Sequence, residues 1–310
     1  MSPLAHRLGD AMYEIATSYM RADDLDAAIV ASRESIDRWR AVSGVDSASE
    51  AYGWQNLSVA LQRSGKLDES LAAVTEAVRL REARIGESAV LAVALVGQAS
   101  VLGELGRWEQ AVPIYDRGLQ MSRATMAPGD VSLSQLLINR GDALAHLRRF
   151  DDARRDYDEA IGLYENTGGK GIDLAIAVYN RGDLTARQGR CNEAMRDHTR
   201  AIALLDELGR PNFYVLMYPL SGKGACLVRS GRPAEAIPLL ERALRCKAGG
   251  ADAFEVARVH AYLGRALVET RRDVAGGLAM VRAARPAIAA GRDGAEELAT
   301  LDRWLASHAR

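Results

Sequence analysis

The sequence predicts an all-α solenoid of about seven helix-turn-helix repeats that end in a capping helix. Two observations support this prediction. A short phrase recurs seven times at nearly constant spacing along the 310 residues, and the chain lacks the β-branched and aromatic clusters that mark strands. Hydrophobic residues make up 48% of the chain but aromatic residues only 5%, which favours helix over sheet.

The recurring phrase marks the start of the second helix of each repeat. It is clearest at residues 66–71, Lys-Leu-Asp-Glu-Ser-Leu, and its relatives begin at residues 24, 107, 149, 190, 232 and, more weakly, 272. One position always holds a small residue: Ala28, Ser70, Ala111, Ala153, Ala194, Ala236 and Gly276, at spacings of 42, 41, 42, 41, 42 and 40. Intervals this similar indicate one structural unit repeated in register.

The first helix of each repeat carries a second small residue, twelve positions earlier. These residues are Ala16, Ser58, Ala99, Gly141, Gly182, Gly224 and Gly264. Small side chains on both helices allow a close crossing, and helix pairs joined by a short turn are the unit of α-solenoids. The turn between them contains Gly65, Gly106, Gly189 or Gly231 in four repeats, where a helix prefers a left-handed C-terminal residue.

In chain order, we expect the repeats to start near residues 9, 51, 92, 134, 175, 217 and 257. Residues 1–310 are expected to form a single domain, since a repeat array of this size can be one continuous body. After the seventh repeat and a break at residues 291–294, Leu298, Leu301, Trp304 and Leu305 follow at helical spacing. This pattern predicts a capping helix at about residues 295–308, which covers the apolar face of the last repeat.

The repeat resembles the tetratricopeptide repeat (TPR). Its pattern is matched by Trp54, Leu57, Ser58, Leu61 and Gly65, followed by Leu67, Ser70, Val74 and Ala77, and the phrase Asn-Arg-Gly at 139–141 is typical of it. The spacing of 41 or 42 exceeds the usual length of about 34 and is similar to the variant in kinesin light chains and bacterial signalling arrays. The resemblance implies a right-handed superhelical solenoid whose first helices line a concave groove.

The charge balance disfavours two classes of partner. The chain has 40 Lys and Arg against 41 Asp and Glu, a formal net charge of −1, so no global field attracts nucleic acid or an anionic membrane. No segment approaches the ~18 uninterrupted apolar residues of a membrane helix. We therefore expect a cytoplasmic protein without nucleic-acid or membrane partners.

The three cysteines indicate a reducing compartment. Their odd number and the lack of CxxC spacing fit reduced thiols better than a disulfide framework. Cys191 and Cys226 fall at core positions of the repeat, so we interpret them as small hydrophobic residues.

The sequence predicts no enzyme activity, catalytic residue, metal site or cofactor. A phosphate-binding loop is not formed, because Gly169-Lys170 has Tyr164 where the first glycine should stand. The five histidines are far apart and form neither an HExxH motif nor a zinc-spaced set with cysteines. His198 and His260 occupy positions that large core residues usually fill, so they are interpreted as packing residues.

The remaining candidate site is the inner face of the first helices, where residues three and four apart point into the groove. Tyrosine buries area at low entropic cost, and an amide can pair with both N–H and C=O of an extended backbone. The repeat register gives these partner-binding candidates: Tyr13, Tyr52, Gln55, Asn56, Arg63, Asn139, Asp142, Tyr179, Asn180, Asp183, Arg187 and Tyr218.

Two interpretations of the asparagines stay open. Asn56, Asn139 and Asn180 share one repeat position and resemble part of the asparagine ladder by which some TPR proteins hold a peptide, but they could equally bond neighbouring helices. The clamp that holds the carboxylate end of chaperones needs Lys and Asn four residues apart. Tyr13 and Thr17 stand there instead, which disfavours that ligand class.

These observations predict a protein-interaction module that binds a segment of a partner polypeptide in its groove. The alternative is a regulatory array that senses a peptide or small ligand and controls an associated effector such as a kinase or protease. The interaction module and the sensor can be distinguished by scattering, because only a sensor should change its scattering radius when it binds its ligand. A homo-oligomer is also possible.

Overall fold

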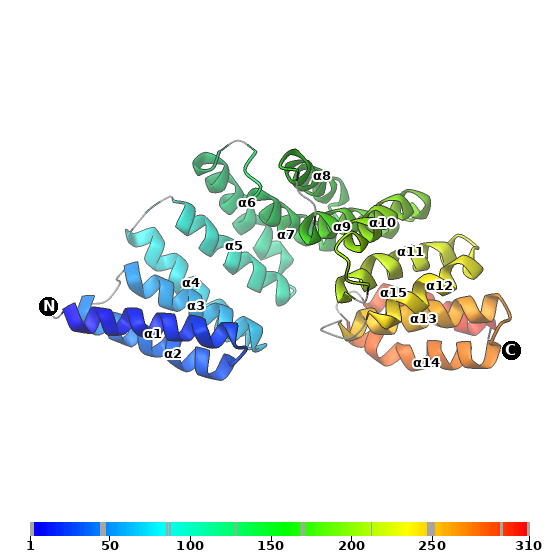
Figure 1. Ribbon diagram of the computed structural model, residues 1–310, viewed down its shortest axis with the longest axis horizontal. Helices are drawn as coiled ribbons and strands as arrows, with labels where there is room; N and C mark the ends of the chain where they lie inside the picture. The colour runs from blue at the N-terminus through cyan, green and yellow to red at the C-terminus, as the bar shows by residue number, and fades with distance from the viewer. Residues whose placement is uncertain are drawn as a thin grey trace. The chain divides into compact units, whose positions relative to one another are not determined.

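The computed structural model describes residues 3–43, 48–84, 86, 88–127, 129–168, 171–211, 213–246, 252–291 and 294–308. Within these residues the chain forms fifteen α-helices and one short 3-10 helix, η1, and no strand (Figure 1). The predicted all-α repeat fold is therefore confirmed. Contacts divide the chain into two compact units, Met1–Arg149 and Phe150–Arg310, so the expected single domain of residues 1–310 stays a prediction.

Unit 1 contains the first seven helices. They are α1 Pro3–Arg21, α2 Leu25–Ser43, α3 Ala48–Arg63, α4 Leu67–Arg84, α5 Ala89–Glu104, α6 Trp108–Thr125 and α7 Leu133–His146. Each helix packs against the next one along the chain, and the first helices of neighbouring repeats also touch, α1 with α3 and α5 with α7. This is the stacking of helix pairs that a solenoid requires.

Unit 2 contains the remaining helices and follows the same order of packing. They are α8 Phe150–Asn166, α9 Ile172–Arg187, α10 Cys191–Asp206, η1 Tyr214–Leu216, α11 Met217–Arg229, α12 Pro233–Arg245, α13 Ala253–Glu269, α14 Val274–Ala290 and α15 Gly294–His308. The first helices α9, α11 and α13 contact one another in sequence, so they form one continuous face. The last helix, α15, packs on α14.

Left-handed residues end the first helix of all seven repeats. Four are the predicted glycines, with φ of 76° at Gly65, 74° at Gly106, 81° at Gly189 and 72° at Gly231. The other three repeats hold the same conformation without glycine, at Asp23, Arg148 and Arg271. The left-handed turn is thus present in every repeat, including the three that have no glycine at this position.

The predicted small residues lie where paired helices cross. In the second repeat, the hydroxyl oxygens of Ser58 and Ser70 are 2.9 Å apart, and Ser70 also donates to the Ser58 carbonyl oxygen at 2.8 Å. The fifth repeat has Gly182 on its first helix, where a Cβ would lie 3.1 Å from the ring of His198. His198 is fully buried, as its core position predicted.

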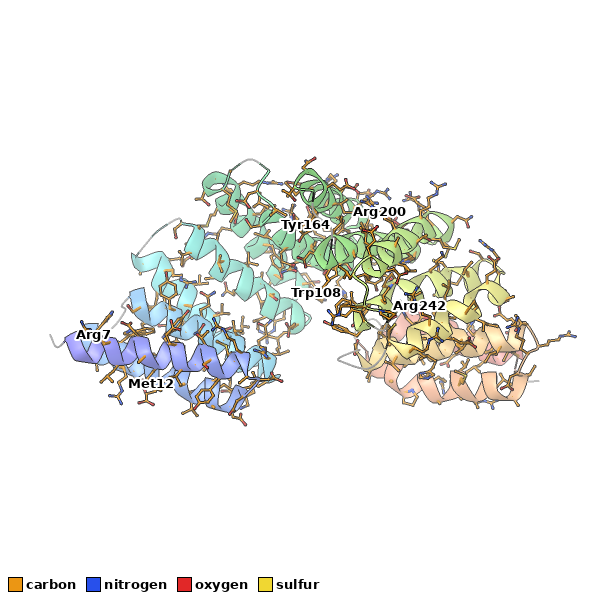
Figure 2. All side chains as sticks on the ribbon, in the orientation of Figure 1. Arg7, Met12, Trp108, Tyr164, Arg200 and Arg242 are labelled. Carbon is orange, nitrogen blue, oxygen red and sulfur yellow. The ribbon has the colours of Figure 1, made fainter. Side chains whose placement is uncertain are left out.

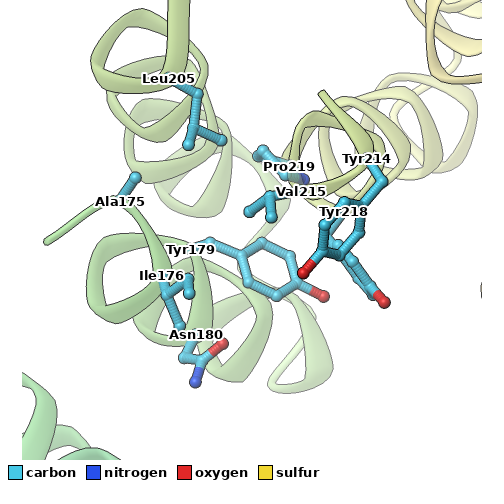
Figure 3. Close-up of a pocket in the computed structure, with 9 residues that line it drawn as sticks. All are labelled: Ala175, Ile176, Tyr179, Asn180, Leu205, Tyr214, Val215, Tyr218 and Pro219. Carbon is cyan, nitrogen blue, oxygen red and sulfur yellow. The ribbon is translucent and has the colours of Figure 1, made fainter. Parts of the chain in front are cut away.

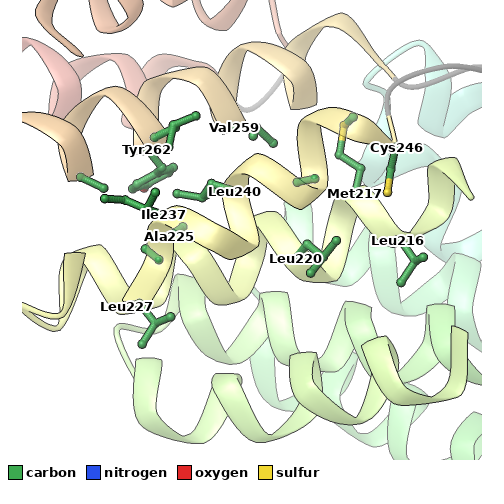
Figure 4. Close-up of a cluster of buried hydrophobic side chains, with 14 of the residues drawn as sticks. Leu216, Met217, Leu220, Ala225, Leu227, Ile237, Leu240, Cys246, Val259 and Tyr262 are labelled. Atoms are coloured by element: carbon green, nitrogen blue, oxygen red, sulfur yellow. The ribbon is translucent and has the colours of Figure 1, made fainter. Parts of the chain in front are cut away.

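One hydrophobic cluster of unit 2 includes residues from α9 to α13. Leu216, Met217, Leu220 and Leu240 are completely buried there, together with Cys246 (Figure 4). Burial of apolar area on this scale is the main stabilising contribution to helices that are only marginally stable alone.

Surface ion pairs link the second helices of successive repeats. Arg200 pairs with Glu165 and Arg242 with Asp206; both arginines are labelled in Figure 2. Arg117 pairs with Glu82 in the same way in unit 1. These side chains are partly exposed, so each pair contributes little to stability and is weakened by salt. No helix in the described residues has the length and apolarity to cross a bilayer.

Candidate functional site

Nine of the twelve candidate residues line three pockets on the first helices. One pocket belongs to unit 1 and two belong to unit 2. Helical spacing places side chains three and four residues apart on one face, which is why the repeat register identified them from the sequence.

The N-terminal pocket has a volume of 340 Å³. Its lining residues are Tyr13, Tyr52, Gln55, Asn56, Arg81, Ala89, Val90 and Val93. The rings of Tyr13 and Tyr52 meet edge to face, with centroids 6.5 Å apart. The guanidinium of Arg81 lies over the Tyr52 ring, 5.1 Å from its centroid. Sequence analysis missed Arg81 because the residue lies on α4, a second helix, whereas the candidates were taken from first helices.

The asparagine of the N-terminal pocket is tied to its neighbour. Asn56 Nδ2 donates to Thr17 Oγ1 at 3.1 Å, and the Thr17 hydroxyl donates to the Tyr13 carbonyl oxygen at 3.0 Å. At this position, then, the amide joins α3 to α1. Its Oδ1 atom makes no hydrogen bond in the described part of the chain, so one half of the amide stays available to a ligand.

The tyrosine pocket of unit 2 is mainly apolar and has a volume of 260 Å³. Its lining residues are Ala175, Ile176, Tyr179, Asn180, Leu205, Tyr214, Val215, Tyr218 and Pro219 (Figure 3). Tyr179 comes from α9 and Tyr218 from α11, and their ring centroids are 5.9 Å apart. In Figure 3 the Tyr179 ring lies between Ile176 on one side and Tyr214 and Tyr218 on the other. The residues of η1 were not expected, because the repeat pattern contains no helix there.

The charged pocket has a volume of 290 Å³ and lies among α9, α11, α13 and α15. Its lining residues are Asp183, Arg187, Arg229, Phe254, Arg258, Tyr262, Glu296, Glu297 and Thr300. Among these residues, Arg258 lies 3.2 Å from Glu255, which is next to the pocket in sequence, and 3.6 Å from Asp183. The lining residues include three arginines and three carboxylates, so their formal charges balance.

Burial shapes the ionisation of this network. Desolvation raises the pKa of Glu255, which the nearby Arg258 partly opposes. Burial alone would lower the pKa of Arg258, but Glu255, Tyr179 and Asp183 hold it well above its usual value. Tyr179 also has a raised pKa, first because it is buried and second because Asp183 is close. Arg258 therefore stays charged and can anchor the face formed by α9, α11 and α13.

Three candidate residues lie outside these pockets. Arg63 donates to the Met20 carbonyl oxygen and to Asp23, both at 2.7 Å, and so fastens α3 to the α1–α2 turn. Asn139 accepts a hydrogen bond from Gln135 at 2.8 Å on its own helix, α7. The third residue, Asp142, lies near Tyr115. Burial raises the pKa of Tyr115, and the charge of Asp142 raises it further. The described residues contain no group of three His, Cys, Asp or Glu side chains placed to hold a metal ion.

Comparison with known families matches the tetratricopeptide repeat at residues 7–83 and 132–207, and a second description of that repeat matches residues 96–167. Together these matches cover more than half of the chain. The chain belongs to the tetratricopeptide repeat family. Comparison with curated proteins yields no match.

Solved structures share the fold at low identity. A tetratricopeptide repeat protein from Parabacteroides merdae is 18% identical with a TM-score of 0.64, over 95% of this chain and 97% of that one. Kinesin light chain-like repeats from Podosopora anserina are 14% identical with a TM-score of 0.56, over 65% and 97%. A signal transduction ATPase from Pyrococcus horikoshii with a tetratricopeptide repeat sensor is 13% identical with a TM-score of 0.68, over 89% of this chain and 41% of that protein. Such identities establish the fold alone.

Proposed function

We propose that this protein is an interaction module that binds a segment of a partner polypeptide along the inner face of its first helices. The tyrosine pocket carries the proposal. It offers room for one large apolar side chain between two repeats, and Asn180 at its edge can pair with the backbone of the same segment. Aromatic pockets of this kind hold the residues that dominate binding energy in protein interfaces.

The proposed partner is a protein or peptide, and no catalytic step is involved. Tetratricopeptide repeat proteins are generally non-catalytic scaffolds. The near-zero net charge argues against nucleic acid and anionic membranes as partners. Three free, buried cysteines suit a reducing compartment such as the cytoplasm. Association of two copies through the same face would compete with the partner and is measurable by ultracentrifugation.

Selection from a peptide library tests the proposal even though the partner is unidentified. The immobilised protein would be used to select from a displayed library of random linear peptides of about twelve residues. Affinities of the selected peptides would then be measured by fluorescence polarisation for the wild type and for Ile176→Trp, which fills the pocket. Val274→Trp is the matched control, since Val274 is 44% exposed on α14 and outside the pocket.

The expected result is a shared apolar residue in the selected peptides and at least about tenfold weaker binding to Ile176→Trp. The control variant should bind like the wild type. Selection that enriches no peptide, or equal binding by both variants, would refute the proposed site.

The regulatory sensor remains a second candidate because of the charged pocket. Arginines and carboxylates from α9, α11, α13 and α15 meet around one cavity, so a ligand bound there would contact four helices at once. The Pyrococcus horikoshii protein is described as carrying a tetratricopeptide repeat sensor. For a sensor, adding a ligand found by thermal-shift screening of amino acids and short peptides should change the scattering radius. A simple interaction module should bind with the radius unchanged.

A further inference from the structure

Arg81 is a buried cation without an anionic partner among the described residues. It is 1% exposed, and within the same part of the chain its guanidinium makes one hydrogen bond, from Nη1 to the Val90 carbonyl oxygen at 3.2 Å. Its Nε and Nη2 atoms are buried and find no hydrogen-bond acceptor in the described structure. Burial lowers the pKa of Arg81, and the hydroxyls of Tyr52 and Tyr13 oppose this shift.

Two other arginines with little exposure in the described part of the chain do have a carboxylate beside them. Arg258 lies 3.2 Å from a Glu255 oxygen, and Arg265 lies 3.5 Å from Glu269. A buried charge that lacks a counter-charge is costly, and proteins pair such groups almost without exception. Among the described residues, Arg81 is therefore an arginine to which an outside anion would supply the counter-charge that these residues do not provide.

The repeat itself does not require an arginine at this position. Counting eleven residues from the small residue of the second helix gives Arg81 in the second repeat, Trp39 in the first and Leu205 in the fifth. The last two are buried apolar side chains, 3% and 1% exposed. An apolar residue would fill the space without the desolvation cost, so packing gives no reason for the charge.

Arg81 is one of the residues that line the N-terminal pocket, from which a ligand can approach it. The Tyr52 ring that covers it is 43% exposed and belongs to a surface side chain, so a change of rotamer uncovers the cation. Beside it stand the Gln55 amide, which no described residue bonds, the free oxygen of Asn56, and Val93, which is 52% exposed. Amides and an apolar contact next to a cation suit a polypeptide segment that passes through the pocket.

We infer that the N-terminal pocket binds an aspartate or glutamate side chain of the partner segment through Arg81. This inference rests on the proposed function, since it names the chemistry of one residue in the bound segment. A carboxylate pairs with a guanidinium in a bidentate, charge-assisted geometry and supplies acceptors for both unbonded N–H groups. The Gln55 and Asn56 amides would hold the backbone on either side of that residue.

The test uses the whole chain and two parallel library selections. Wild type and Arg81→Met would each be used to select from the displayed random peptides, which carry no free carboxyl terminus. Arg79→Met is the matched control, because Arg79 lies two residues away on α4, is half exposed and pairs with Glu76. Selected peptides would be resynthesised with blocked ends, each with its acidic residue intact or changed to the corresponding amide.

The wild type and Arg79→Met should enrich peptides with an acidic residue, and the amide peptides should bind at least tenfold more weakly. Arg81→Met should enrich peptides that share only the apolar residue. Its melting temperature should rise, because the unpaired charge is gone; a merely structural arginine bonded to Val90 would lower it.

The outcomes separate the two proposals. If no protein enriches any peptide, the proposed function fails and this inference fails with it. If the wild type enriches apolar peptides without an acidic residue, the inference alone is refuted. It is also refuted if acidic peptides bind only when their carboxyl terminus is free and not when it is blocked. A third refuting result is that millimolar phosphate or acetate raises the melting temperature of the wild type as much as the peptide does.

Discussion

Gly264 on α13 and Gly277 on α14 each face the carbonyl oxygen of the other. A Cβ atom on Gly264 would lie 2.5 Å from the Gly277 oxygen, and a Cβ on Gly277 would lie 2.5 Å from the Gly264 oxygen. Both contacts are to backbone, which cannot move aside as a flexible side chain can. At this crossing the two helices of the seventh repeat are therefore closer than they could be if either residue had a Cβ atom.

Gly264→Ala should destabilise the protein by about 1 to 3 kcal/mol, because the added methyl group must separate two helix backbones. Chemical unfolding followed by circular dichroism measures this. Gly162→Ala is the control, since a Cβ there meets nothing within 4 Å on α8. The control should stabilise the protein by roughly 0.5 to 1 kcal/mol through helix propensity. Equal effects of both changes would contradict the close crossing.

The same crossing shows how far the repeat pattern could be followed in the sequence. The spacing predicted Gly276 as the small residue of the seventh repeat, but the contact is made by Gly277. Asp273 caps α14 by accepting from the Gly276 N–H at 2.8 Å, which turns Gly276 toward the cap. Two adjacent glycines fit the phrase equally well, so the sequence could not choose between them. Counted to Gly277, the last interval is 41, in line with the others.

Arg271→Gly should raise stability by roughly 1 kcal/mol, because Arg271 holds φ of 56°, a left-handed conformation that a side chain disfavours. Gly231→Ala makes the opposite change at the same position of the preceding repeat, where φ is 72°, and should lower stability by a similar amount. Differential scanning calorimetry of the pair measures both effects. Two shifts of the same sign would show that the turns are not equivalent.

Stability should fall as the pH drops from about 6.5 toward 4 because of His198. Burial, which is the main cause, lowers the pKa of this histidine to about 4, with Arg258 and Lys223 acting in the same direction and Asp183 and Asp197 opposing them. In the unfolded chain His198 binds a proton near pH 6.5, whereas in the native state it stays neutral until the pH is near 4. The resulting loss between pH 7 and pH 5 is about 2 kcal/mol. Urea midpoints across this range should depend less on pH in His198→Leu, and an unchanged slope would contradict the assignment.

Cys191 should react as a thiolate at a lower pH than an ordinary cysteine. The neighbouring Cys226 thiol, aided by Arg229, lowers the pKa of Cys191 below its usual value, although burial acts the other way. Burial raises the pKa of Cys246, which therefore serves as an internal control. Alkylation by iodoacetamide, followed residue by residue with mass spectrometry, should reach half its maximal rate at a lower pH for Cys191 than for Cys246. Cys226→Ala should move that midpoint to higher pH.

The part of the candidate site that lies on the first helices was predictable from the repeat. The part that comes from other helices packed against them was not. The register of the first helices identified Tyr179 and Tyr218 as neighbours on one face. It could not identify Arg81 or Glu297, because the first lies on a second helix and the second on the closing helix. These two residues lie at the pockets because of how the helices stack in space, and the repeat pattern in the sequence does not contain that information.

The asparagines can be separated by measuring stability and affinity on single variants. Asn56 Nδ2 bonds Thr17 on the neighbouring helix, so Asn56→Ala should lower the free energy of unfolding by about 1 kcal/mol. Asn180 lies at the edge of the tyrosine pocket, where the proposed segment would bind. Asn180→Ala should weaken peptide binding by about 1 to 3 kcal/mol, because peptide backbone groups lose their partner. Thermal unfolding and fluorescence polarisation on both variants test this, and a destabilised Asn180→Ala with unchanged affinity would remove Asn180 from the site.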